Sequence, residues 1–259
     1  MIRRVFAKRQ WRALALFLIV LVPVAAIEAG ADAYTGTVDS ANARYVVATY
    51  RQFLDHDPGD VELDAHLDRL AAGGDISREQ VARALLFGER GSANEVDRAY
   101  QSILGRSAEP SGSRYWTAHL QDHDVLDLRV LLMSSDEYVR RSGGTNRAWI
   151  TALYRDVLGR KAESAGLSYW TQVADRGVAR PIIVAGFYLS RESLGNRTDA
   201  YYRIVLDRAP TAAERAAGAS TIAAEGERSF YARLWASDEA FEPYFDLGWE
   251  ASDRGRADL

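Results

Sequence analysis

The stretch that decides the fold is Leu153–Trp170, "LYRDVLGRKAESAGLSYW", because a second copy of it lies upstream at Ala99–Trp116, "AYQSILGRSAEPSGSRYW". Weaker copies of its opening begin at Thr49, "TYRQFLDHDP", and at Tyr201, "YYRIVLDRAP". The aligned tyrosines, which are 50, 54 and 48 positions apart, are Tyr50, Tyr100, Tyr154 and Tyr202. A period of about 50 residues is typical of a repeat architecture.

Each copy has the residue spacing of α-helices. Before Gly159, apolar side chains form one stripe on a helix of 3.6 residues per turn, at positions 149, 150, 153, 154, 157 and 158. Gly105 and Gly159 then suit a left-handed helix C-cap, where the outer copies carry Asp55 and Asp207. A second helix carries Tyr-Trp, and a third is apolar nearly all round, which predicts burial.

Each copy also closes with an acidic corner. The corner residues are Glu89, Glu137, Glu192 and Glu239. Ser134, Ser190 and Ser237 precede three of these corners, and we expect each serine to cap a helix N-terminus. Pro181 fits the first turn of a helix, where its missing N–H costs nothing.

These patterns predict an all-α fold. We expect a degenerate tandem repeat of four units of about 50 residues, with roughly three helices per unit. The predicted units are 41–92, 93–145, 146–198 and 199–245, where the middle two are similar and the outer two divergent. A signal peptide at 1–33 precedes them, and a polar tail at 246–259 follows.

The first 33 residues have the three parts of a secretory signal peptide. Five basic residues precede the uncharged run Ala13–Ile27, and Ala31-Asp32-Ala33 offers a cleavage site. Fifteen apolar residues are short for a bilayer span, which needs roughly 20. We therefore expect a secreted, cell-surface or periplasmic protein, with anchoring by an uncleaved N-terminal helix as the alternative.

Composition narrows the function classes. The chain has no cysteine, which excludes disulfides and thiolate chemistry. Cleavage after Ala33 leaves 27 basic and 34 acidic residues, an excess that opposes nucleic-acid binding. We expect a membrane partner only if the N-terminal segment is retained.

With the copies aligned, the chain resembles the bacterial domain-of-unknown-function family 4214. The resemblance rests on the Tyr-Arg-x-x-Leu-Gly-Arg phrase and the Gly-Leu-x-Tyr-Trp helix, most fully between residues 93 and 195. The second copy departs from the pattern at Gln101 and Ser113. The opening phrase is more remotely similar to phycobilisome linker domains. The resemblance implies an exported or surface-associated helical module and carries no activity.

The repeated aromatic and basic residues are the candidate binding residues. Tyr115, Trp116, Tyr169 and Trp170 are positioned either to bind sugar faces or a partner, or to fill the core of each unit. Arg106 and Arg160 follow a helix end, where an arginine grips an external anion or pairs with a nearby acid.

Metal and catalytic motifs are weak. His119 and His123 share a helix face, but two histidines do not complete a zinc site, so we predict no metal centre. The acidic run 55–64 keeps calcium as an alternative to no cofactor, although it fails the EF-hand pattern. Glu192-Ser193 resembles the acid of glycan-cleaving transglycosylases without the rest of that signature.

We therefore predict an exported, non-catalytic helical repeat protein that binds or scaffolds in the cell envelope or extracellular space. Its expected partner is an envelope or extracellular protein or a glycan. The alternatives are a glycan-active enzyme of the cell wall and a membrane-anchored assembly factor.

Overall fold

A computed structural model describes residues 40–71 and 73–242, so the predicted signal peptide and polar tail lie outside the described residues. All regular secondary structure in the described part is helical, which confirms the all-α prediction. No helix among these residues is both long enough and apolar enough to cross a bilayer.

The helices fall into two halves of the chain. The N-terminal half (residues 40–141) contains α1 (Ala41–Leu54), α2 (Asp60–Leu70), α3 (Gly74–Phe87), α4 (Glu89–Leu104), α5 (Pro110–Asp122), α6 (Leu126–Ser134) and α7 (Asp136–Arg141). The C-terminal half (residues 145–242) contains α8 (Asn146–Leu158), α9 (Ser164–Asp175), α10 (Arg180–Tyr188), α11 (Arg191–Leu206), α12 (Ala212–Glu225), α13 (Glu227–Trp235) and α14 (Asp238–Phe241).

The predicted unit boundaries meet these helices in different ways. The boundary at 145/146 coincides with the start of α8, whose N-cap is Thr145. The boundaries at 92/93 and 198/199 fall inside α4 and α11, because the acidic corner continues into the next tyrosine helix. The four-unit tandem repeat remains a prediction.

The helix ends follow the predicted chemistry. Gly105 and Gly159 cap α4 and α8 in the left-handed region, with φ of 64° and 66°. Asp55 and Asp207 take the same conformation after α1 and α11, with φ of 62° and 52°, which is strained for a residue with a Cβ. Pro181 lies in the first turn of α10, as expected.

Two of the three predicted serine caps are confirmed. The Ser190 and Ser237 hydroxyls accept hydrogen bonds from the Ser193 and Ala240 amides. The prediction for Ser134 is wrong by one residue: Ser135 caps α7, and Ser134 is the last residue of α6. Two adjacent serines made both registers compatible with the sequence.

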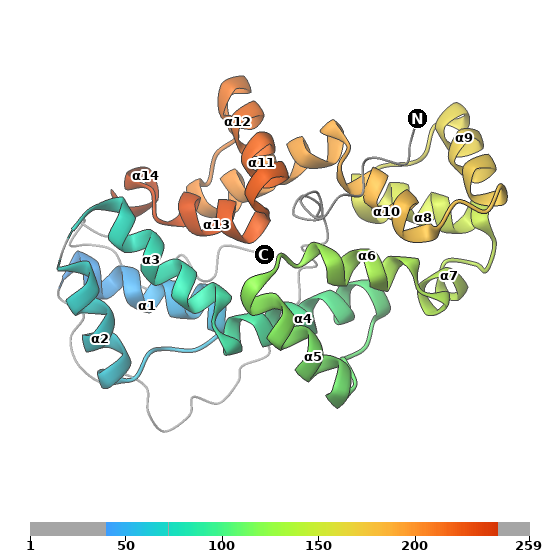
Figure 1. Ribbon diagram of the computed structural model, residues 1–259. Helices are drawn as coiled ribbons and strands as arrows, with labels where there is room; N and C mark the ends of the chain where they lie inside the picture. Colours follow the sequence, from blue (N-terminus) through green and yellow to red (C-terminus); the bar gives the residue numbers. More distant parts are fainter. Residues whose placement is uncertain (1–39, 72, 243–259) are drawn as a thin grey trace.

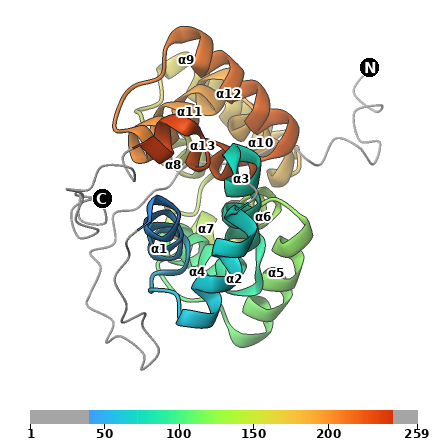
Figure 2. The same ribbon diagram turned by 90° about the vertical axis from the view of Figure 1, so that its left-hand side faces the viewer.

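The C-terminal half lies on the N-terminal half in both views (Figures 1 and 2). Two equivalent arginines join them. Arg180 donates to the Ser134 carbonyl at 3.2 Å and to Asp136 at 2.6 Å. Arg78, 102 positions earlier, donates to the Ala236 carbonyl at 2.8 Å and to Asp238. Because the acceptors are also 102 positions apart, the contact is reciprocal, as in an isologous interface.

Helix α13 closes the molecule by packing against α3 of the first unit (Figure 1). Ala232 and Phe241 from the C-terminal end join the buried cluster of α1 to α3. The Phe53 ring meets Tyr231 edge-on at 5.1 Å. The helices of the first and last predicted units are therefore neighbours in space, whereas in an open solenoid each unit contacts only its sequence neighbours.

The third helices are less buried than their composition predicts. Met133 on α6 and Ile183 and Tyr188 on α10 are fully buried in the larger core. However, Leu131 on α6 and Ile182 on α10 are about half exposed, at 53% and 46%. Each helix is therefore covered on one side only.

Candidate functional site

The two Tyr-Trp pairs divide between surface and core. Tyr115 on α5 and Tyr169 on α9 are 64% and 61% exposed. Trp116 is buried in the larger core, and Trp170 packs against its edge. Of the four aromatics, therefore, the tyrosines are exposed to solvent and the tryptophans act in packing.

The tryptophans have identifiable packing partners. The Trp170 ring lies 5.2 Å from the Phe187 ring, centroid to centroid. A Cβ at Gly186 would come within 3.2 Å of the Trp170 ring, so α9 and α10 approach each other closely at this glycine. The neighbouring Tyr169 meets Trp170 edge-on at 5.2 Å and stays on the outside.

Tyr115 begins a stack of rings along α5. Its ring plane lies 14° from that of His119, and the His119 and His123 rings stack at 4.1 Å. His119 Nε2 lies 3.1 Å from an Asp127 carboxylate oxygen, and His123 Nδ1 lies 3.0 Å from the His119 carbonyl oxygen. Within 40–71 and 73–242, no set of three or more metal-binding side chains converges.

Each of the repeated arginines forms hydrogen-bonded ion pairs with two carboxylates. Arg106 donates two hydrogen bonds to Glu137, both at 2.8 Å, and one to Glu109 at 2.9 Å. The Arg106 guanidinium also lies 5.3 Å from the Tyr100 ring centroid. Arg160 donates in the same way to Glu192 and Glu163, and its guanidinium lies over the Tyr154 ring.

A third arginine, Arg208, pairs in the same way with Glu239 and Glu214, and its guanidinium lies over the Tyr202 ring. Arg208 was not among the predicted binding residues. Hydrogen bonds from the arginine lower the pKa of Glu137 and bring that of Glu214 down to about 2. These guanidinium groups already have carboxylate partners. Binding of an external anion by Arg106 or Arg160 would therefore have to displace an internal pair.

The carboxylates of the acidic run 55–64 contact separate nearby groups and do not converge on one point. Arg98 pairs with Asp55 at 2.8 Å, and Arg51 pairs with Asp57. Glu62 accepts from the Gly59 amide at 3.0 Å, which starts α2. The carboxylates therefore serve ion pairs and a helix start in this arrangement, and calcium remains an untested alternative.

A buried ionic network, which the sequence analysis missed, lies where the halves meet. Glu227 at the start of α13 accepts hydrogen bonds from Arg129 at 3.0 Å, Tyr201 at 2.9 Å and Arg197 at 3.4 Å. Arg129 also donates to Glu95 at 2.5 Å. Arg197 is fully buried, and Glu227 is 2% exposed.

The next residue, Arg228, connects α13 to three helices of the N-terminal half, α3, α4 and α5. Its guanidinium donates to the carbonyls of Leu86 on α3 and Leu120 on α5, and to the Ser92 hydroxyl at 3.1 Å. Asp124 accepts from the Arg228 amide at 3.4 Å and so caps α13 from the loop before α6. The network therefore fixes the closing helix.

Burial dominates the electrostatics of this network. It raises the pKa of Glu227 to about 7, against the opposing effect of Arg129. Burial likewise lowers the pKa of Arg197 to about 10. The fully enclosed carboxylate has no access for a substrate, so the network is a structural element.

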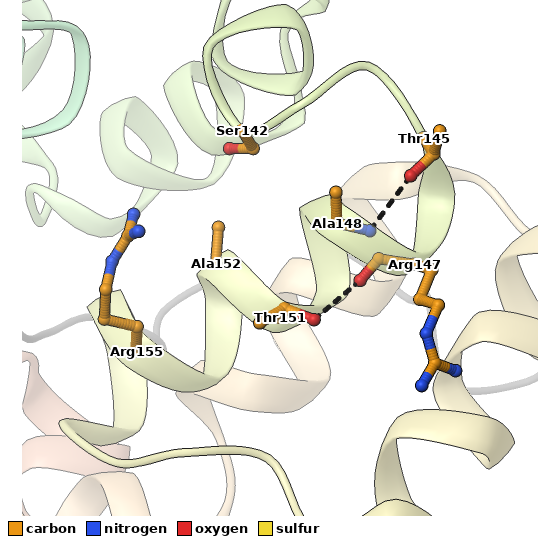
Figure 3. Close-up of a pocket in the computed structure, with 7 residues that line it drawn as sticks. All are labelled: Ser142, Thr145, Arg147, Ala148, Thr151, Ala152 and Arg155. Carbon is orange, nitrogen blue, oxygen red and sulfur yellow. Dashed lines mark hydrogen bonds between the residues drawn. The ribbon is translucent and has the colours of Figure 1, made fainter.

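A shallow surface hollow lies between the loop after α7 and the helix α8 (Figure 3). Its volume is about 390 Å³, and it is lined by Ser142, Thr145, Arg147, Ala148, Thr151, Ala152 and Arg155. A second hollow of about 290 Å³ shares Ser142 and Arg155 with it and adds Arg141. The sequence analysis did not select these residues, although residues 138–155 contain four arginines and no acid.

Residues 130–196 match the model of the family described as "Domain of unknown function (DUF4214)". The match runs from within α6 into α11 and contains the whole Leu153–Trp170 phrase. It confirms the resemblance for the third copy, while the opening phrase of the second copy lies outside it. The remoter similarity to phycobilisome linker domains remains a prediction. No curated protein and no solved structure matches the chain.

Proposed function

We propose that this protein is an exported, non-catalytic binding or scaffolding module whose partner is a glycan or a protein of the cell envelope or extracellular space. The observation that carries the proposal is the pair of exposed tyrosines, Tyr115 and Tyr169. They occupy the same place in two successive copies, 54 positions apart. Exposed aromatic rings on a fixed scaffold are suited to stacking on sugars or anchoring a partner.

The glutamates at the acidic corners already pair with arginines, and this supports a role in binding over one in catalysis. Glu137 and Glu192 each accept two hydrogen bonds from one arginine. A general acid or base needs a substrate within hydrogen-bond reach of a carboxyl whose pKa is close to the working pH. Glu227 has such a pKa, but it is enclosed by α6, α11 and α13.

The N-terminal sequence supports the proposed location. Export through a signal peptide predicts that the mature protein begins at Tyr34. N-terminal sequencing of the protein from the producing cells tests this prediction. A start at Met1 or Ile2 in membrane fractions would instead favour the anchored assembly factor.

Co-sedimentation with isolated cell-wall polysaccharide, with and without calcium, tests the binding function. We expect the wild-type protein to sediment with the polymer, and the Tyr115→Ala/Tyr169→Ala variant to remain in the supernatant with unchanged helicity. The matched control is Val61→Ala/Leu131→Ala, which removes two apolar side chains that are also exposed. Equal loss in both variants would reject the tyrosine surface, and no sedimentation of the wild type would redirect the search to protein partners.

A further inference from the structure

The junction between the two halves differs from the two junctions it resembles. In α4 and α11 the acidic corner and the following tyrosine share one helix of 16 residues. The separation is 11 positions from Glu89 to Tyr100 and 17 positions from Glu137 to Tyr154. The extra residues divide the helix into α7 and α8, so this corner alone departs from the recurring pattern in the described residues.

The division of the helix creates the two hollows. Gly143 and Gly144 turn the chain with φ of 108° and 73°, a conformation that favours glycine. Ser142 on this loop faces the first turns of α8 across the larger hollow (Figure 3). The second hollow continues from Ser142 and Arg155 to Arg141, toward the end of α4.

The depression is positively charged in a chain with an overall excess of acid. Arg140, Arg141 and Arg147 are exposed, and none of their guanidinium groups has an ion-pair or hydrogen-bond partner within 40–71 and 73–242. Arg155 is 71% exposed and pairs with its neighbour Asp156. Asp156, which also accepts from the Tyr138 hydroxyl at 2.6 Å, offsets the charge of Arg155, so Arg141 and Arg147 carry the unpaired positive charge of the depression.

A structural role accounts for only part of this cluster. A Cβ at Gly105 would lie 2.7 Å from an Arg141 nitrogen, so the Arg141 guanidinium covers the C-terminus of α4. A cation at a helix C-terminus is favourable. This position gives no reason for Arg147, which lines the opposite end of the depression at the start of α8.

We infer that this depression, which we name the arginine groove (Arg141, Ser142, Arg147, Arg155), binds a carboxylate-bearing polysaccharide. Guanidinium groups bind carboxylates through two parallel hydrogen bonds. Arginines at both ends and in the middle of a shallow groove suit a linear polyanion better than a single small ion. The inference rests on the proposed binding function and names a ligand class for it.

The lining favours a glycan over other polyanions. Serine, threonine and alanine make up the rest of the larger hollow, so it offers no deep apolar pocket for peptide side chains. The exposed tyrosines of α5 and α9 lie on other helices, so the groove is a second contact for a long polymer. Nucleic acid requires a wider basic footprint than the three arginines of this groove in an acidic chain.

Affinity measurements with polygalacturonate, and with dextran as the neutral polymer, test the arginine groove. The test variant is Arg141→Gln/Arg147→Gln. The matched control is Arg176→Gln/Arg203→Gln, which removes two exposed, unpaired arginines elsewhere and changes the net charge equally. We expect the groove variant to lose affinity for polygalacturonate by about tenfold or more, and the control to change by less than about twofold.

The competing outcomes separate the inference from the proposed function. Equal losses in both variants, unchanged binding by the groove variant, or tighter binding of poly-glutamate or single-stranded DNA would overturn the arginine groove. Wild-type protein that binds cell-wall polysaccharide but not polygalacturonate would also overturn it while leaving the proposed function standing. Failure to bind any polysaccharide would reject both.

Discussion

Substitution of Glu227 by alanine tests whether the buried network holds the closing helix in place. The change removes the carboxylate that accepts from Arg129, Arg197 and Tyr201. Arg129 keeps Glu95, but Arg197 is fully buried and loses its carboxylate partner. Removal of one member of a buried ion pair costs about 3–5 kcal/mol. This loss is a large part of a typical stability of about 5–15 kcal/mol.

Denaturant unfolding at pH 8 measures this loss, with Glu137→Ala as the matched control. Glu137 is also paired with an arginine, but about a third of its side chain is exposed and Arg106 keeps Glu109. Solvent screening limits such a pair to about 1 kcal/mol or less. Similar losses in the two variants would refute the assignment of the network as the element that fixes α13.

Three further substitutions test other parts of the structure. Burial raises the pKa of Glu227 above its ordinary value, so the stabilisation from its protonated, neutral form is present below pH 4.5 and is lost as pH rises through about 7, above which only the ion pairs of the carboxylate remain. The free energy of unfolding of Glu227→Gln should lack this loss across the same pH range, and parallel pH profiles of the variant and the wild type would contradict the raised pKa. Asp207→Gly should stabilise the protein by about 0.5–1 kcal/mol in chemical denaturation by relieving a φ of 52°, and a lower stability would show that the aspartate side chain matters more than its backbone strain. Trp116→Ala should lower the free energy of unfolding by about 3–5 kcal/mol because it truncates a core side chain. Tyr115→Ala should lower it by less than about 1 kcal/mol because the Tyr115 side chain is mostly exposed. Equal melting temperatures for the two variants would place both rings on the surface.

Local helix chemistry made most of the fold predictable from the sequence. Gly105 and Gly159 cap their helices because a left-handed C-cap favours glycine, and this preference acts within a single turn. The Tyr-Trp phrase predicted a packed second helix, but sequence spacing alone left open which ring faces outward. Only the position of α10 beneath Trp170 decides this question.

The closure of the molecule was not predictable in this way. Glu227 and Arg228 look like a solvated helix start, whereas their aligned counterparts Val125 and Leu126 are buried. Charged residues at positions that are apolar and buried in a sister copy were the available signal. Their partners include residues 98 and 142 positions away, which no local pattern specifies.

The arginine groove was missed for a different reason. The predicted binding residues recur between copies, whereas the groove arises where the copies differ. The 17-position separation between Glu137 and Tyr154 was visible as the longest of the three tyrosine spacings. An insertion that divides a helix and adds arginines without acids is therefore the feature to search for in related sequences.

Hydrogen–deuterium exchange of the protein, free and bound to cell-wall polysaccharide, tests the central claim most directly because it maps the binding surface without a substitution. The account predicts slower exchange on binding in the turns around Tyr115 and Tyr169 and in the segment 140–147. Protection confined to other helices, or no protection at a saturating concentration of polymer, would contradict it.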